Sequence, residues 1–122
     1  MFLKTQITAI GPDVADLIEG GVLILFADGA PPELAEVSVL HKVAHVDKVQ
    51  PKAGATIKIG ALEAKITAMG DYAWNKVIEI GHVVINFNNA AATERPGEIC
   101  ATVLDGAALM ANLKPGQTIS IS

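Results

Sequence analysis

The sequence has no long hydrophobic run, although it is rich in apolar residues. Hydrophobic residues make up 51% of the 122 positions and charged residues only 18%. No apolar run approaches the roughly 20 residues that a membrane-spanning helix needs. The first residues also lack the basic region and apolar stretch of a signal peptide. We therefore expect a cytoplasmic protein with no segment inserted in a membrane.

Cysteine, aromatic residues and excess positive charge are also scarce. The single cysteine, Cys100, excludes an internal disulfide and a cysteine-based metal cluster. It lies in an apolar, strand-like run and is expected to pack as a small hydrophobic residue. A net charge of −4 with scattered signs offers no surface for nucleic acid. An aromatic content of 4% argues against a platform for stacking sugars.

An internal repeat is the most informative feature that is present. Residues 36–59 align without a gap onto residues 98–121, with six identities in 24 pairs. Ile7–Gly11 likewise matches Ile66–Gly70, and Val22–Phe26 matches Val83–Phe87. The halves, about 1–60 and 61–122, are each too small to bury a comfortable core alone. We therefore expect one domain, 1–122, in which both halves share a core.

The elements within each half are short and mostly extended. Residues 3–10 alternate, with Leu3, Thr5 and Ile7 on one face. Strands are predicted at 3–10, 22–26, 37–41, 56–59, 61–69, 82–87, 98–103 and 117–121. Short helical stretches are predicted at 12–19, 72–78 and 105–113. This pattern indicates an all-β fold with short helices, as a small closed barrel or a sandwich.

Histidine is the residue type that differs most tellingly between the halves. At the position of His41 the second half has Val103, and at that of His45 it has Ala107. The shared fold needs neither histidine, which makes His41 the first functional candidate. On an extended strand, residues four apart are separated by roughly 13 Å. Because His41 and His45 would then be too far apart to share an ion, we expect no metal site.

The sequence around each of the three histidines favours a different role. His45 lies in a stretch that reads as a solvated connection, and His82 reads as a ring packed under a turn with one N–H bonded to a carbonyl. Both are kept only as possible supporting residues. His41, at the end of a predicted strand with no acidic neighbour, is expected to be exposed and neutral. Such an imidazole can accept a phosphoryl group while its other nitrogen is held by a hydrogen bond.

No nucleotide-binding loop, serine-hydrolase elbow or zinc-protease motif occurs, but several weaker motifs recur in a recognisable order. They are F-x-x-G-A-P-x-E-L (Phe26–Leu34), Leu40-His41 after an apolar run, P-x-x-G (Pro51–Gly54), Ile66–Gly70, Gly81–Phe87 and Pro96-Gly97. Together they resemble the glucitol/sorbitol-specific IIA component of the bacterial phosphoenolpyruvate-dependent sugar phosphotransferase system. The resemblance runs over nearly the whole chain.

The resemblance implies a closed six-stranded β-barrel that needs no cofactor. It implies a phosphocarrier that takes a phosphoryl group from the histidine-containing phosphocarrier protein onto Nε2 of His41. The group would then pass to the IIB part of a sorbitol permease, which phosphorylates the sugar during uptake, and the IIB and IIC components are the partners expected. Members of the family have His-Cys-His after the strand, whereas this chain has His41-Lys42-Val43-Ala44-His45, about one residue longer. A supporting role for His45 is therefore in doubt.

Two other functions fit the same residues. One is a non-catalytic β-barrel module that binds and regulates a partner. The other is a lipoyl- or biotinyl-type carrier, but Lys76 lies in a predicted helix instead of on a tight hairpin. A phosphocarrier is distinguished from both because it must present His41 at the surface, so burial of His41 would count against it.

Overall fold

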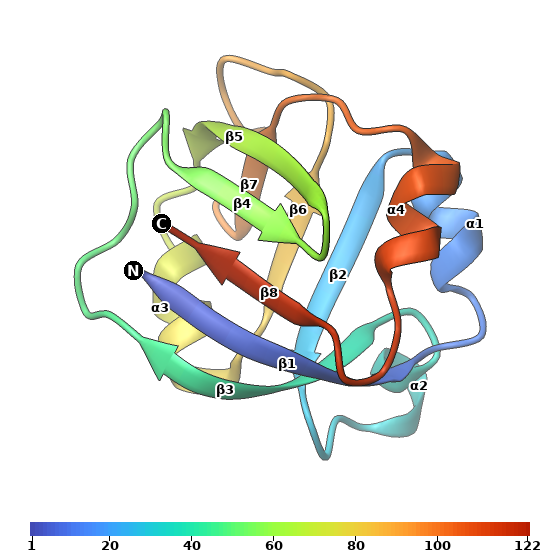
Figure 1. Ribbon diagram of the computed structural model, residues 1–122. Helices are drawn as coiled ribbons and strands as arrows, with labels where there is room; N and C mark the ends of the chain where they lie inside the picture. The colour runs from blue at the N-terminus through green and yellow to red at the C-terminus, as the bar shows by residue number, and fades with distance from the viewer.

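The computed structural model describes residues 1–122 as a closed β-barrel with four short helices around it (Figure 1). The strand order around the barrel is β1-β3-β2-β6-β7-β5-β4-β8. The strands are β1 (Leu3–Ile10), β2 (Val22–Ala27), β3 (Val39–Val46), β4 (Thr56–Ile59), β5 (Leu62–Met69), β6 (Val83–Asn86), β7 (Glu98–Ala101) and β8 (Thr118–Ile121). The helices are α1 (Val14–Glu19), α2 (Pro32–Ala35), α3 (Ala73–Ile80) and α4 (Gly106–Asn112).

The barrel is closed, as expected, but it has eight strands and not six. The eight segments that alternate or run apolar in the sequence all became strands. The neighbouring strands β4 and β5 form a hairpin around Gly60, pairing Ile59 with Leu62. Every strand has two neighbours, so the barrel leaves no open edge.

The helices cover the outside and ends of the barrel. Helices α1 and α4 lie side by side, and α3 lies on the opposite side (Figure 1). The three longer helices follow the predicted stretches closely, whereas the four-residue helix α2 was expected to be part of a loop. Proline within the first turn of α2 is compatible with a helix start. None of these helices is long and apolar enough to cross a membrane.

The strand pairing follows the same plan in both halves. Strand β3 pairs antiparallel with β1 and parallel with β2, and β7 pairs with β5 and β6 in the same two ways. The antiparallel pairs β2–β6 and β4–β8 join the halves. Three neighbouring strands of the first half (β1, β3 and β2) are therefore followed around the single barrel by three of the second (β6, β7 and β5), and β4 and β8, one from each half, close it.

One hydrophobic core of 23 buried residues fills the interior. The alternation in β1 is the predicted one, because Leu3, Thr5 and Ile7 are buried and the intervening side chains are exposed. Trp74, on α3, is also buried, and its indole N–H donates to the carbonyl of Asp47 at 2.8 Å. This bond fastens α3 of the second half to the segment that follows β3.

Strand β3 begins later and runs further than predicted. It continues through Val46, so His41 lies inside the strand and not at its exit. Lys4 pairs with His45 and Thr5 with Val43, which leaves Ala44 as an extra residue in a β-bulge. The bulge breaks the period of two along 42–46, and for this reason the stretch reads as a solvated connection in the sequence.

Candidate functional site

The side chain of His41 is buried, with only 1% of its surface exposed. The prediction that it is exposed is therefore wrong. Its backbone pairs with Ile7 of β1 on one side and with Ala27 of β2 on the other, so the residue belongs to the middle of the sheet. Alternation along β3 turns His41 inward together with Val39.

Both ring nitrogens of His41 have a hydrogen-bond partner. Nε2 lies 2.6 Å from the carbonyl oxygen of Gly81, and Nδ1 lies 2.5 Å from the hydroxyl oxygen of Thr5. A carbonyl oxygen only accepts, so Nε2 carries the hydrogen and donates it. In the neutral ring Nδ1 is then an acceptor, and the hydroxyl of Thr5 donates to it. These partners assign the Nε2–H tautomer to the resting protein.

The carbonyl of Gly81 reaches His41 because of how α3 ends. Gly81 has φ of +62°, and its N–H bonds to the carbonyl of Val77 while that of His82 bonds to Lys76. This is the left-handed glycine cap that ends many helices. A Cβ at position 81 would lie 3.3 Å from Nε2 of His41 and 3.0 Å from Cβ of Ala27. A residue without a side chain therefore lets the helix end approach the ring closely.

A pocket of about 330 Å3 opens beside His41. The end of α3 forms one wall and β3 forms another. The lining residues are Ala27, Asp28, His41, Lys42, Val43, Val46, Val77, Ile78, Glu79, Ile80 and Gly81. Gly81, whose carbonyl contacts Nε2, is among the lining residues, whereas Thr5, which contacts Nδ1, is not.

Burial lowers the pKa of His41 from its ordinary value. The removal of the ring from water is the largest influence, because it disfavours the charged form. The bond to Gly81 and the negative charge of Asp28 act in the opposite direction. Asp28 is an acidic neighbour that the local sequence does not reveal, and its carboxylate accepts a hydrogen bond from Thr8. The net result favours a neutral imidazole.

The second half carries alanine at the two positions that correspond to this pair. Ile7 pairs with His41, and its counterpart Ile66 pairs with Ala101. The strand register therefore makes Ala101 the counterpart of His41, two residues before the Val103 that the gapless alignment indicates. Ala64 occupies the position of Thr5, and Ala64 and Ala101 are both buried. The same barrel geometry thus contains a polar pair in one half and an apolar pair in the other.

The other two histidines lie outside this arrangement. His45 is exposed on β3, and its Nε2 lies 3.3 Å from the carbonyl oxygen of Met1. His82 packs its ring against Phe26, and its Nδ1 lies 3.0 Å from the carbonyl oxygen of Leu25. That is the packing expected of a ring held under a turn. Neither histidine lines the pocket beside His41.

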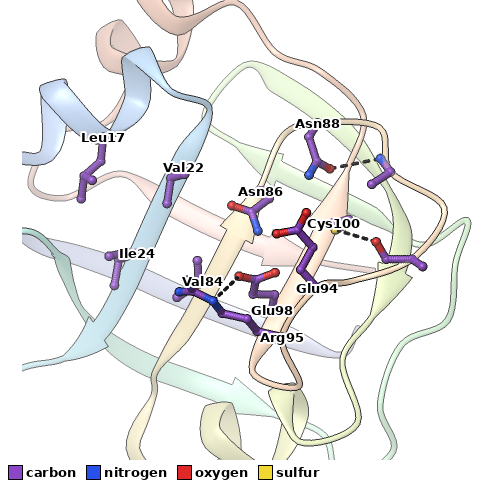
Figure 2. A pocket seen from close by; sticks show the side chains of 12 residues that line it. Leu17, Val22, Ile24, Val84, Asn86, Asn88, Glu94, Arg95, Glu98 and Cys100 are labelled. Atoms are coloured by element: carbon purple, nitrogen blue, oxygen red, sulfur yellow. Dashed lines mark hydrogen bonds and ion pairs between the residues drawn. The ribbon is translucent and has the colours of Figure 1, made fainter.

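A second pocket, of about 460 Å3, lies beside β2, β6 and β7 (Figure 2). Leu17, Val22 and Ile24 form an apolar side, and Arg95 and Glu98 form an ion pair at 3.9 Å. Cys100 also lines it and is buried, as predicted, and burial raises the pKa of its thiol. This pocket contains no histidine and shares no residue with the other.

Sequence reasoning missed the two groups that hold His41. The signal for Thr5 was present, since it is a polar residue on the apolar face of an alternating strand. Gly81 carries a weaker signal, a glycine directly after a helix, which predicts a cap but not what its carbonyl contacts.

The fold has a close match among solved structures. The crystal structure of a phosphotransferase-system IIA component from Enterococcus faecalis V583 superimposes with a TM-score of 0.79. The match covers 96% of this chain and 97% of that chain, at 24% sequence identity. At this identity the likeness shows a shared fold, the barrel of that IIA component.

Comparison of the sequence with known protein families identifies one family. The family described as "PTS system glucitol/sorbitol-specific IIA component" matches residues 2–121. The glucitol/sorbitol-specific EIIA components of Shigella flexneri and Escherichia coli (strain K12) are each 31% identical over 96 residues, which is 79% of this chain and 77% of theirs. The chain belongs to the glucitol/sorbitol-specific IIA family, and as such it works with other proteins of the phosphotransferase system.

Proposed function

We propose that this chain is a cytoplasmic phosphocarrier that accepts a phosphoryl group on His41. The donor is the histidine-containing phosphocarrier protein, and the acceptor is the IIB component of a glucitol or sorbitol permease. The observation that carries the proposal is the buried pair of Thr5 and His41 beside an open pocket, where the other half of the barrel has Ala64 and Ala101. A buried polar pair is costly and is not required by this fold.

Nε2 is the nitrogen proposed to react. Its partner Gly81 lines the pocket, whereas Nδ1 contacts Thr5 inside the barrel. A phosphoryl donor on a separate protein approaches from the pocket side. The linkage is therefore expected at Nε2.

Burial of His41 requires a local movement before transfer. Its Nε2 is occupied by the carbonyl of Gly81, and no face of the ring lies open. The adjoining helix end carries Ile78 and Ile80, which are 40% and 42% exposed. These side chains offer an apolar patch for a docking protein, whose contact would displace the helix end and free Nε2. Transient contacts of this kind are small.

The charges around the pocket favour transfer of the phosphoryl group from His41 to the next protein. Lys42 is the one cationic residue of its lining, and Asp28 and Glu79 are its carboxylates. The lysine attracts the phosphoryl oxygens, and the two carboxylates repel the doubly negative phosphoryl group once it is bound to His41. Such a balance favours transfer over storage.

Phosphoryl transfer from labelled phosphoenolpyruvate tests the proposal directly. Purified enzyme I and the histidine-containing phosphocarrier protein are mixed with wild type and with His41→Ala. We expect label that is acid-labile and base-stable on wild type, because phosphohistidine has this stability, and none on the variant. Far-UV circular dichroism establishes that the variant is folded.

His45→Ala and His82→Ala are the matched controls, and both are expected to keep the label. Label that persists in His41→Ala and disappears in one control would move the acceptor to that histidine. Absence of label on folded wild type would favour a non-catalytic module that binds and regulates a partner, a role with which the burial of His41 agrees.

A further inference from the structure

Thr5 contacts His41 from inside the barrel, and its hydroxyl makes no other side-chain hydrogen bond. Its side chain is 1% exposed, and its hydroxyl oxygen lies 2.5 Å from Nδ1. The two residues come from adjacent strands, β1 and β3, and both point inward. The contact therefore does not depend on a loop or on the end of α3.

Attack on phosphorus by Nε2 needs the lone pair of that nitrogen. In the resting tautomer this position carries a hydrogen, which is donated to Gly81. The ring must therefore lose that hydrogen and carry a proton on Nδ1 while it reacts. A partner of Nδ1 that serves both states must be able to donate and to accept. A hydroxyl group can do both, whereas a carbonyl or an amide N–H can do only one.

We propose that Thr5 is a positioning residue for phosphoryl transfer, because its hydroxyl holds Nδ1 of His41 in both ring tautomers and so directs the reaction to Nε2. This inference rests on the proposed function of His41. It adds a residue that recognises neither the donor protein nor the phosphoryl group and that acts only through the histidine ring.

All bonds and hydrogens of the transfer step are accounted for with Thr5 in this role. The N–P bond of the donor's phosphohistidine breaks, and a bond forms between phosphorus and Nε2 of His41. Before attack, the hydrogen of Nε2 exchanges through solvent in the opened pocket, so that the neutral ring keeps one hydrogen, now on Nδ1, which donates to Thr5. The donor's imidazole carries a hydrogen on its other nitrogen and therefore departs neutral. No oxidant, metal or further reactant is consumed.

The second half supplies an internal comparison for Thr5. Its counterpart Ala64 and the counterpart of His41, Ala101, are both buried and carry no polar side-chain group. Barrel packing alone is therefore satisfied by a small apolar residue at this position. The hydroxyl of Thr5 is explained by the histidine that it contacts.

The test compares Thr5→Val, which removes the hydroxyl at nearly constant shape, with Thr5→Ser, which keeps it. Thr67→Val is the matched control, because the buried hydroxyl of Thr67 has no hydrogen-bond partner. We expect single-turnover transfer from the phosphorylated phosphocarrier protein to slow about tenfold or more in Thr5→Val. Thr5→Ser and Thr67→Val should stay within about threefold of wild type.

A second readout reports the ring itself and needs no phosphoryl transfer. Nitrogen chemical shifts of isotope-labelled His41 should show a protonated Nε2 and an unprotonated, hydrogen-bonded Nδ1 in wild type. In Thr5→Val the Nδ1 shift should move to that of a nitrogen without a donor, and Thr5→Ser should restore it.

Each result bears on a different part of the inference. If wild type is labelled on His41 but Thr5→Val transfers at the wild-type rate, the role of Thr5 is overturned and the phosphocarrier remains. If wild type carries its ring hydrogen on Nδ1, the proposed resting state is overturned even if Thr5→Val does not fold. If wild type is not labelled on His41, the phosphocarrier proposal fails first, and the role of Thr5 in transfer fails with it.

Discussion

At the scale of single residues, the site consists of one imidazole whose two nitrogens face different surroundings. Nδ1 meets a hydroxyl inside the barrel, and Nε2 meets a carbonyl at the edge of a pocket. Desolvation outweighs the bond to Gly81 and the charge of Asp28, so the pKa of His41 is lowered. The ring is thus kept neutral, the form that a nucleophilic imidazole needs.

The lowered pKa of His41 predicts a contribution to stability that depends on pH. In the unfolded chain a histidine protonates near pH 6.5, whereas the folded protein resists protonation until lower pH. Below about 6.5 the unfolded state therefore binds more protons, and the free energy of unfolding falls as pH falls. The contribution is fully present above 6.5 and is lost as pH drops through the folded pKa, by at most about 1.4 kcal/mol per pH unit.

Urea unfolding of wild type and His41→Gln, at about pH 7.5 and at about pH 5.5, measures this contribution. The other titrating groups are common to both proteins and cancel in the comparison. Wild type should lose more stability between the two pH values than the variant does. Equal losses in the two proteins would contradict burial of a neutral His41.

At the scale of elements, the end of α3 lies against the histidine. The helix is anchored by buried Trp74 and Val77, and its cap at Gly81 approaches Nε2. Gly21, which follows α1 in the first half, also has a positive φ, of +78°, but its added Cβ would meet only Phe87 O at 3.6 Å. The two halves therefore end a helix in a similar way and differ in what the helix end contacts.

Comparing Gly81→Ala with Gly21→Ala separates the cost of backbone strain from the cost of contact with the site. Both substitutions place a side chain at positive φ, which costs about 1–2 kcal/mol. Gly81→Ala should cost more than Gly21→Ala, because its Cβ also presses on Ala27 and on the ring of His41. Chemical denaturation measures both costs, and the ring nitrogen shifts of His41 should change only in Gly81→Ala. Equal costs with an unchanged ring would show that the helix end does not press on the site.

At the scale of the whole molecule, neither half forms a barrel by itself. The pairs β2–β6 and β4–β8 cross between halves, and the core is one cluster drawn from both. Trp74 of the second half bonds to Asp47 of the first. The site is also built from both halves, because the histidine belongs to one half and the helix end that covers it belongs to the other.

This arrangement predicts a single cooperative unfolding transition. Far-UV circular dichroism and the fluorescence of Trp74, the only tryptophan, should report the same urea midpoint. The pieces 1–60 and 61–122, expressed separately, should show no cooperative transition, because each leaves strands unpaired and core residues exposed. Two distinct midpoints, or one half that folds alone, would contradict a shared core.

The sequence by itself determined the local part of this structure. Alternation in β1, apolar runs in β2 and β6, and glycines after the helices located eight strands and three of four helices, because period and capping depend on neighbouring residues. It also singled out His41. The tertiary structure decided how His41 is held, since its partners Thr5 and Gly81 lie 36 and 40 residues away. The bulge at Ala44, the register that pairs Ala101 with Ile66, and the burial of the ring arise from strand pairing between distant segments, which no local pattern encodes.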